Sequence, residues 1–376
     1  MKALKIFSVF VLLIITFSFT VSAAEENNYN EYYARQFEAS GAGNLSSGLD
    51  SETKRLLEDL GIDISDLESI KAPDIKNVFA VILDCVKNGI SKPLSVTVCL
   101  MGIMLIFSLI NATVPMEKQY GGYTVFVCLA CGVILLTPVA ELIRGSETVL
   151  KTLSGFLIVF VPVLAAVTAS AGYGATSAGM SAMLIGATEF MSQFVSFFFV
   201  PVTGGIMCLG VCSSFSPFPG LAKLCELIKK GALWCFGIAT TVFSGVLSMQ
   251  TSVSAAADTI GIKTSKTVIA SMLPVMGPAI SEALGTARGC MSLLRSGVGI
   301  YGIVGLALTV LPMFISLICW RLGLWLCSVV SEIFEIKQAT ALFKAVDFCL
   351  AVLVGALVFV AMLFIISITV VTKAGG

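Results

Sequence analysis

The sequence predicts an all-α, polytopic integral membrane protein with about seven or eight membrane segments and a small helical exported N-terminal region. Hydrophobic residues make up 57% of the 376 residues and charged residues only 12%, about half the charged share of a typical soluble domain. The apolar residues gather in runs long enough to cross a bilayer, and short polar links separate these runs. The chain has no histidine, which excludes histidine-based metal, triad and acid–base chemistry.

Residues 1–23 have the pattern of a secretory signal peptide. Lys2 and Lys5 precede the short apolar run Ile6–Val21, and small residues follow it. A basic start, a short apolar core and small residues at its end are typical of a cleaved signal. We therefore expect cleavage after Ala23 or Ala24; the alternative is an uncleaved first membrane helix.

Residues 24–92 form an acidic exported region with 13 acidic and 7 basic side chains, a net charge of −6, whereas residues 93–376 carry 10 acidic and 14 basic side chains, a net charge of +4. Ser51 is expected to cap a short helix that Gly61 stops. From Pro73 to Gly89, apolar residues recur at helical spacing and predict a second helix. The apolar face of this helix packs either on its own region or on the membrane surface, the membrane domain or another protein.

Residues 93–376 form the polytopic membrane domain. Its apolar runs predict these membrane segments: Leu94–Val114, Tyr123–Ile143, Leu153–Ala171, Met183–Val200, Pro201–Cys212, Gly231–Met249, Thr267–Leu284, Val298–Trp320 and Phe348–Val371. Pro201 divides one long apolar stretch, so the count depends on whether the chain reverses there. The short run Leu322–Val330 is expected to be an interfacial or partly buried helix.

The segment Thr267–Leu284 is apolar but broken. Pro274 and Pro278 lack a backbone donor and Gly277 adds conformational freedom, so these three residues are candidate helix-break positions. Broken backbone at membrane depth is tolerated only where protein or a water-filled cavity covers it. We therefore expect a helix break here, and both a spanning and a re-entrant segment stay open.

Five polar side chains are candidates for lining a polar path in the membrane: Glu189, Gln193, Glu282, Arg288 and Arg295. Glu189 and Gln193 are four residues apart, so they project from one helix face. Glu282 and Arg295 are expected to be partners beyond the helix break. The alternative for Arg288 and Arg295 is that they extend to a membrane interface.

A structural role is the alternative for Glu189, as one partner in a hydrogen bond between helices. Ala178, Ala182 and Gly186 form a row of small residues on the same predicted helix, which favours close helix packing. Asp258, near Lys263 and Lys266, is expected to be a solvated loop charge.

Other motifs carry no chemistry in their context. Cys128 and Cys131 lie inside an apolar run, where cysteine packs as a small hydrophobe. Gly297, Gly299 and Gly302 match a dinucleotide pattern, but no strand precedes them, so they predict close helix packing or a flexible helix start instead. The chain lacks a Walker A sequence and a basic cluster with interleaved aromatics. We expect no metal, cofactor, nucleic acid or catalytic residue, and hence a non-enzymatic protein.

The placement of basic residues predicts an orientation. A cleaved signal puts the acidic region outside the cytoplasm, so the turn with Lys118 is expected to be cytoplasmic. A reversal at Pro201 places the basic loop with Lys223, Lys229 and Lys230 on the same side. The side of the C-terminus stays open.

Residues 90–372 resemble the stage III sporulation protein AE family of endospore-forming bacteria. The segments that carry the resemblance are Leu157–Gly172, Gly245–Lys266 and Leu273–Gly302. In the last of them, Glu282 and Cys290 match the family pattern, and Arg295 stands where the family has lysine.

The resemblance implies a multi-pass subunit of the mother-cell membrane that surrounds the forespore. It would act in a transenvelope channel or secretion-like complex that supports forespore development after engulfment. Its partners would be other stage III A proteins, a forespore membrane protein and a separate ATPase. The alternatives are a stand-alone small-molecule permease, with Glu189 and Glu282 in its path, and a structural scaffold that recruits ring-forming partners.

Overall fold

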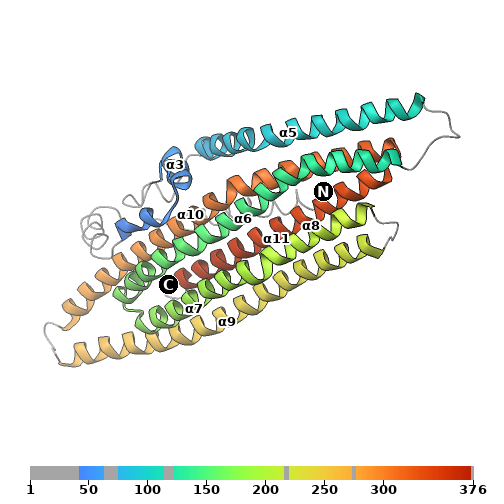
Figure 1. Ribbon diagram of the computed structural model, residues 1–376. Coiled ribbons are helices and arrows are strands. Elements are labelled where there is room, and N and C mark those ends of the chain that lie inside the picture. Colours follow the sequence, from blue (N-terminus) through green and yellow to red (C-terminus); the bar gives the residue numbers. More distant parts are fainter. Residues whose placement is uncertain (1–41, 63–74, 114–121, 216–219, 273–276, 374–376) are drawn as a thin grey trace.

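The computed structural model describes residues 42–62, 75–113, 122–215, 220–272 and 277–373, and every regular element within them is a helix (Figure 1). In chain order the elements are the 3₁₀ helix η1 (Ala42–Gly48), α3 (Ser51–Asp59), α5 (Ile75–Thr113), α6 (Gly122–Ser170), α7 (Gly174–Phe194), the π-helix η3 (Val195–Phe199), α8 (Val200–Phe215), α9 (Gly220–Met272), α10 (Gly277–Ile333) and α11 (Lys337–Lys373). The predicted signal peptide, residues 1–23, lies outside the described residues.

The long helices form an elongated up-and-down bundle around α11 (Figure 1). Its longest helix, α10, has 57 residues and is about 85 Å long. The turns alternate between two ends of the bundle. We call one end of the bundle the Glu335 end, because it holds the α10–α11 turn. We call the other end the Gly172 end, because it holds the α6–α7 turn. The N-terminus of α5 and the C-terminus of α11 both point toward the Gly172 end.

The axis of the bundle is filled with apolar side chains. Helix α11 contacts α6, α7, α8, α9 and α10, and most of its side chains are buried. The ring of Phe194 lies 5.5 Å from that of Phe236 and 5.6 Å from that of Phe359, which joins α7, α9 and α11. Such aromatic contacts add to the apolar area that the helices bury.

Two glycines let α10 approach its neighbours closely, as the sequence predicts. A Cβ atom on Gly299 would collide with Thr372 of α11, and one on Gly302 would collide with the Phe160 ring of α6. The interpretation of these glycines as packing residues is therefore confirmed.

The N-terminal elements η1 and α3 pack along the side of the bundle. Asp50 caps α3, since its carboxylate accepts a 3.1 Å hydrogen bond from the Thr53 backbone N–H, so the predicted cap Ser51 is wrong by one residue. Gly61 has a φ of +68° and ends the helix as predicted. The Thr53 hydroxyl lies 3.1 Å from that of Thr309, halfway along α10.

The predicted helix over Pro73–Gly89 and the predicted segment Leu94–Val114 form one helix, α5, with Pro93 inside it. Gly89 does not end a helix. It packs against α10, where a Cβ atom would lie 3.4 Å from the Ile315 side chain, an ordinary van der Waals contact.

The predicted segments Tyr123–Ile143 and Leu153–Ala171 likewise form one helix, α6, which contains Pro138 and Pro162. The charged stretch between them is helical. Lys151 pairs with Glu147 one turn earlier at 2.6 Å, a spacing that supports a helix rather than a loop.

The chain does not reverse at Pro201. The π-helix η3 joins α7 to α8, and Pro201 is the second residue of α8. Proline is tolerated in the first turn of a helix, and a π turn absorbs the altered hydrogen-bonding pattern before it. Figure 1 shows α7 and α8 as one continuous rod.

Among the described residues, five helices are long and apolar enough to cross a membrane: Asn77–Ile110, Val125–Ser170, Glu226–Thr264, Leu294–Ile333 and Lys337–Thr369. A shorter apolar stretch, Phe197–Cys212, completes this set. The predicted count of seven or eight segments is not confirmed, because predicted neighbours fuse into single helices. The predicted interfacial helix Leu322–Val330 is the last part of α10.

Candidate functional site

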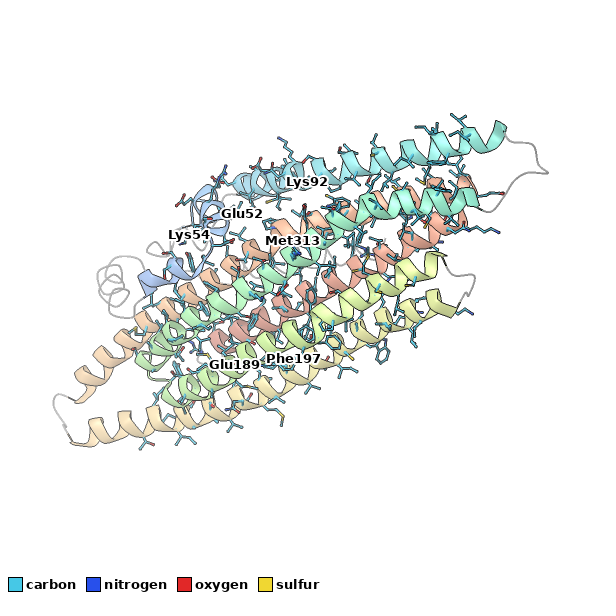
Figure 2. All side chains as sticks on the ribbon, in the orientation of Figure 1. Glu52, Lys54, Lys92, Glu189, Phe197 and Met313 are labelled. Atoms are coloured by element: carbon cyan, nitrogen blue, oxygen red, sulfur yellow. The ribbon has the colours of Figure 1, made fainter. Side chains whose placement is uncertain are left out.

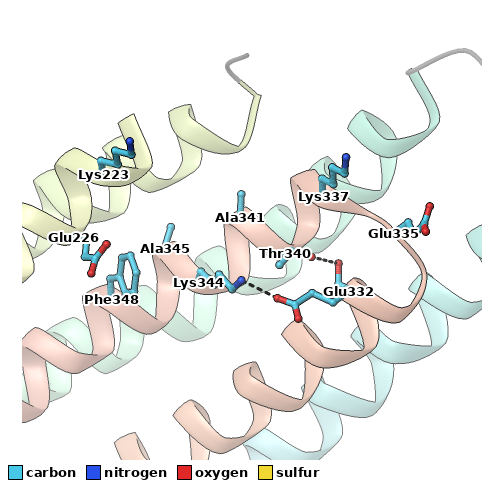
Figure 3. Close-up of a pocket in the computed structure, with 11 residues that line it drawn as sticks. Lys223, Glu226, Glu332, Glu335, Lys337, Thr340, Ala341, Lys344, Ala345 and Phe348 are labelled. Carbon is cyan, nitrogen blue, oxygen red and sulfur yellow. Dashed lines mark hydrogen bonds and ion pairs between the residues drawn. The ribbon is translucent and has the colours of Figure 1, made fainter. Parts of the chain in front are cut away.

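A charged pocket opens at the Glu335 end of the bundle, between the start of α9 and the α10–α11 hairpin (Figure 3). Its volume is about 610 Å³. Three lysines and three glutamates line it: Lys223, Glu226, Glu332, Glu335, Lys337 and Lys344. Phe348, Ala341 and Ala345 supply apolar lining. The pocket therefore offers both charge signs next to an apolar surface.

Ion pairs hold part of this lining in place. Lys344 donates to Glu332 at 2.7 Å and joins α11 to α10, with both side chains more than half exposed. Glu226 pairs with Lys230 at 2.8 Å on α9. Exposed pairs of this kind contribute little to stability, so the lining can rearrange around a bound group.

The α10–α11 turn is fixed by buried hydroxyl groups. The Ile336 N–H donates to the Ser331 carbonyl at 3.0 Å, and the Ser331 hydroxyl donates back to the Ile336 carbonyl at 2.9 Å. The Thr340 hydroxyl donates to the Ser331 hydroxyl oxygen at 3.0 Å. Glu335 lies between them with a φ of +57°, a left-handed conformation that glycine normally occupies.

Replacement of Glu335 by glycine is expected to raise the free energy of unfolding by about 0.5 kcal/mol, since it removes left-handed strain. Glu335→Val is expected to lower it by about 1–2 kcal/mol, because a β-branched residue is poorly compatible with positive φ. Thermal unfolding of the purified protein in detergent measures both changes. Equal stability of the two variants contradicts the prediction.

A second cluster of charges lies deeper in the bundle. Arg321 of α10 makes a two-pronged contact with Asp347 of α11, with donor–acceptor distances of 2.7 and 3.2 Å. Lys229 of α9 lies 4.4 Å from the centre of the Phe348 ring, next in sequence to Asp347. The cluster joins three helices, and its members were not among the predicted site residues.

A polar junction near the Gly172 end joins α7, α9 and α10. Both Asp258 carboxylate oxygens accept 2.8 Å hydrogen bonds from the N–H groups of Ala175 and Thr176 in the first turn of α7. The Arg295 guanidinium lies 5.2 Å from the centre of the Tyr173 ring. Asp258 is 8% exposed and Arg295 is 1% exposed. The expectation that Asp258 is a solvated loop charge is therefore wrong.

Arg295 and Glu282 do not form the predicted pair. Both belong to the continuous helix α10, and 13 residues of helix separate their backbones by about 20 Å. Two side chains cannot bridge that axial distance. Tyr173 and Asp258 are among the residues whose charge acts on Arg295. The side chains of Glu282 and Arg288 lie outside the described residues.

The predicted helix break falls at the bend of a hairpin. Helix α9 ends at Met272 and α10 begins at Gly277, with Pro278 in its first turn. Pro274 lies outside the described residues. Figure 1 shows α9 and α10 meeting at the Gly172 end, so the segment Thr267–Leu284 supplies two helix ends rather than one broken span.

Glu189, which Figure 2 labels, and Gln193 are both exposed on α7. Among the described residues, Glu189 has no hydrogen bond or ion pair, so the predicted bond between helices of this chain is absent there. The row Ala178, Ala182 and Gly186 is also exposed, and a Cβ atom on Gly186 would meet nothing within 4 Å. The row does not mediate packing among the described parts of the chain.

The cysteines give no sign of a metal site. Within the described ranges no group of three or more cysteine, aspartate or glutamate side chains could hold a metal ion. Cys128 and Cys131 are both fully buried on α6.

Comparison with known proteins gives the family. The family model for stage III sporulation protein AE matches residues 64–375. A curated relative, stage III sporulation protein AE of Bacillus subtilis (strain 168), is 24% identical over 246 residues. That match covers 62% of this chain and 59% of the relative's length. No solved structure matches. Because the family model covers most of the chain, the protein belongs to the stage III sporulation protein AE family.

Proposed function

We propose that the protein is a non-enzymatic, multi-pass membrane subunit of a transenvelope channel or secretion-like complex between mother cell and forespore. The complex supports forespore development after engulfment. Its other members are further stage III A proteins and a forespore membrane protein, and a separate ATPase supplies energy. The family membership and the five apolar helices support this proposal.

The outward position of Glu189 carries the proposal that the protein acts as a subunit. The carboxylate is exposed on α7 between the exposed apolar side chains of Ile185 and Phe190. A carboxylate in an apolar membrane surface is costly unless another protein group meets it. A neighbouring subunit that presents a hydrogen-bond donor or a basic side chain satisfies this requirement.

The filled axis of the bundle favours a subunit over a stand-alone permease. Helix α11 occupies the position where a single-chain path would run, and apolar side chains pack around it. Glu189 points away from this axis rather than into it. A path for transported material then forms between subunits, with this chain as one wall.

The direction of the helices supports one arrangement of the two chain ends. If each long rod of the bundle crosses the membrane once, residues 42–62, the N-terminus of α5 and the C-terminus of α11 lie on the same side. A cleaved signal places that side outside the cytoplasm, and the basic start of α9, with Lys223, Lys229 and Lys230, then lies inside.

Glu189→Leu tests the subunit proposal. The variant is expected to insert normally and to lose at least tenfold in both partner recovery and spore yield, because the carboxylate contact is gone. Recovery of partners from sporulating cells through a tag on this chain is the measurement. Thr241→Leu is the matched control, since Thr241 is exposed on α9 and its hydroxyl bonds only to its own helix.

Equal partner recovery from the Glu189→Leu and Thr241→Leu strains contradicts the proposed contact. The permease alternative has its own test, which is solute flux through liposomes that contain only the purified chain. Flux without partners overturns the subunit proposal itself.

A further inference from the structure

Two zones of exposed apolar side chains lie on opposite faces of the bundle, and further exposed apolar side chains, among them Ile185, Phe190 and Phe197, lie outside them. The first, called the α5 zone, lies toward the Glu335 end on α5, α6 and the last part of α10. Its exposed members include Leu94, Val98, Leu109, Phe126, Leu136 and Trp325. No charged residue occurs between residues 93 and 113 of α5 or between 123 and 140 of α6.

The second, called the α9 zone, lies farther from the Glu335 end on α9. Its exposed members are Trp234, Ile238, Val242, Val246, Met249 and Val253, which recur at helical spacing along one face. No charged residue occurs between residues 231 and 257. Each zone spans about 20 residues, or about 30 Å, which is the thickness of a bilayer's hydrocarbon core.

One level of charged residues separates the two zones. On the α5 side, Lys92 forms an ion pair with Glu141 of α6 at 3.8 Å. Five residues farther along α5, the Thr97 carbonyl contacts the Cys327 sulfur, which relates this part of α5 to α10. At the same level, Arg321 of α10 pairs with Asp347 of α11. Lys229 of α9 also lies there, over the ring of Phe348. The α5 zone therefore ends at the level where the α9 zone begins.

Beyond the zones, exposed charged side chains occur together with isolated exposed apolar ones, such as Phe79, Ile158 and Leu227. Beyond the α5 zone, toward the Gly172 end, the exposed charged residues are Glu52, Arg55, Glu58, Asp59, Asp84, Lys87, Arg144 and Lys151. Beyond the α9 zone, toward the Glu335 end, the charged pocket opens. Figure 2 shows Glu52, Lys54 and Lys92 along one side of the bundle, with Glu189 and Phe197 along the other.

A bilayer perpendicular to the bundle cannot match this pattern. At the level of the α9 zone it would bury the charges of α3 and α6 in hydrocarbon. At the level of the α5 zone it would cover much of the pocket instead. Burial of this many ionised side chains in lipid is prohibitive.

We propose that the bundle crosses a single bilayer obliquely, with the α5 zone and the α9 zone in the same hydrocarbon layer. The charged pocket then opens to water on one side of the membrane. The charged faces of α3, α5 and α6 open to water on the other side. This inference rests on the proposed membrane location of the chain.

The expected inclination follows from helix geometry. The contacts α5 to α10, α10 to α11 and α11 to α9 link the two zones across the bundle, and α10 also contacts α9 directly. At a spacing of about 9 Å, two to three contacts span about 18–27 Å. The zones are offset by about 30 Å along the bundle, so the axis inclines by an angle of the order of 45°.

Two pairs of single cysteines test the inclination, each pair at one level of the bundle. The first pair is native Cys235 in the α9 zone and Arg55→Cys on α3. The Phe236–Phe359 contact and the Thr53–Thr309 contact put these positions at a similar level. The second pair is native Cys99 in the α5 zone and Lys223→Cys in the pocket. All four positions are exposed on the isolated chain.

Each position is kept as the one cysteine of an otherwise cysteine-free chain, in cells that express it, and treated with a membrane-impermeant maleimide. Arg55→Cys is expected to react in intact cells, and Lys223→Cys only after permeabilisation. Until detergent is added, Cys235 is expected to react at least tenfold less than Arg55→Cys, and Cys99 at least tenfold less than Lys223→Cys. Equal reactivity within either pair overturns the oblique placement.

Other outcomes separate this inference from the proposed function. Reaction of all four cysteines without detergent removes the membrane location itself. If Lys223→Cys reacts in intact cells and Arg55→Cys reacts only after permeabilisation, the bundle is still inclined but has the opposite orientation in the membrane. Trp234 and Trp325 give a second readout, because brominated lipids are expected to quench the fluorescence of both, whereas buried Trp320 is shielded. Quenching of only one of the two exposed tryptophans contradicts the inference.

Discussion

Asp258→Ala is expected to lower the free energy of unfolding by about 3 kcal/mol. The carboxylate satisfies two N–H groups in the first turn of α7, both at 2.8 Å, and it does so from α9. Loss of a helix cap costs about 1–2 kcal/mol, and hydrogen bonds to a charged group contribute about 1.5–3 kcal/mol. The variant also removes a negative charge that acts on buried Arg295.

Two further variants show where this effect arises. Asp258→Asn keeps one acceptor oxygen, so this variant is expected to lower the free energy of unfolding by about half as much. Asp84→Ala removes an exposed carboxylate on α5 and is expected to change stability by less than about 0.5 kcal/mol. Thermal unfolding of the purified variants in one detergent is the measurement. An Asp258→Ala variant as stable as Asp84→Ala contradicts the capping role.

The presence of helices could be predicted from the sequence, but most of their ends could not. Apolar runs and helical spacing identify almost every segment that the structure contains. Proline, glycine and charge disfavour an isolated helix, so the interruptions between apolar runs predict helix ends. In the bundle, Pro93, Pro138 and Pro312 all lie inside helices. Contacts with neighbouring helices outweigh these local preferences, and one sequence does not report them.

The site residues show the same limit more clearly. Glu189 and Arg295 were singled out because charges are rare in apolar segments, and that signal depends only on composition. The partner of Asp258 is a helix start 82 and 83 residues earlier in the chain, and no local pattern points to it. Asp347 and Arg321 were missed because each lies next to an apolar run and looks like an ordinary segment boundary.

Asp347→Ala is expected to lower the free energy of unfolding by about 3 kcal/mol. Arg321 and Asp347 are each roughly three-quarters buried, and the carboxylate accepts two hydrogen bonds from the guanidinium. Its removal leaves Arg321 and the nearby Lys229 as like charges without the acid between them. Removal of one partner from a buried pair is far more costly than removal of both.

The double variant Arg321→Met/Asp347→Ala is therefore expected to recover much of the loss, and thermal unfolding in detergent measures both variants. Lys344→Ala is the matched control. It breaks the Lys344–Glu332 pair, which has the same 2.7 Å distance between its charged atoms but whose side chains are 55% and 54% exposed. An exposed pair contributes about 0–1 kcal/mol. Two results contradict the idea that burial makes the Arg321–Asp347 pair important for stability. One is an equal loss of stability in Asp347→Ala and in the double variant, and the other is a loss in Lys344→Ala as large as that in Asp347→Ala.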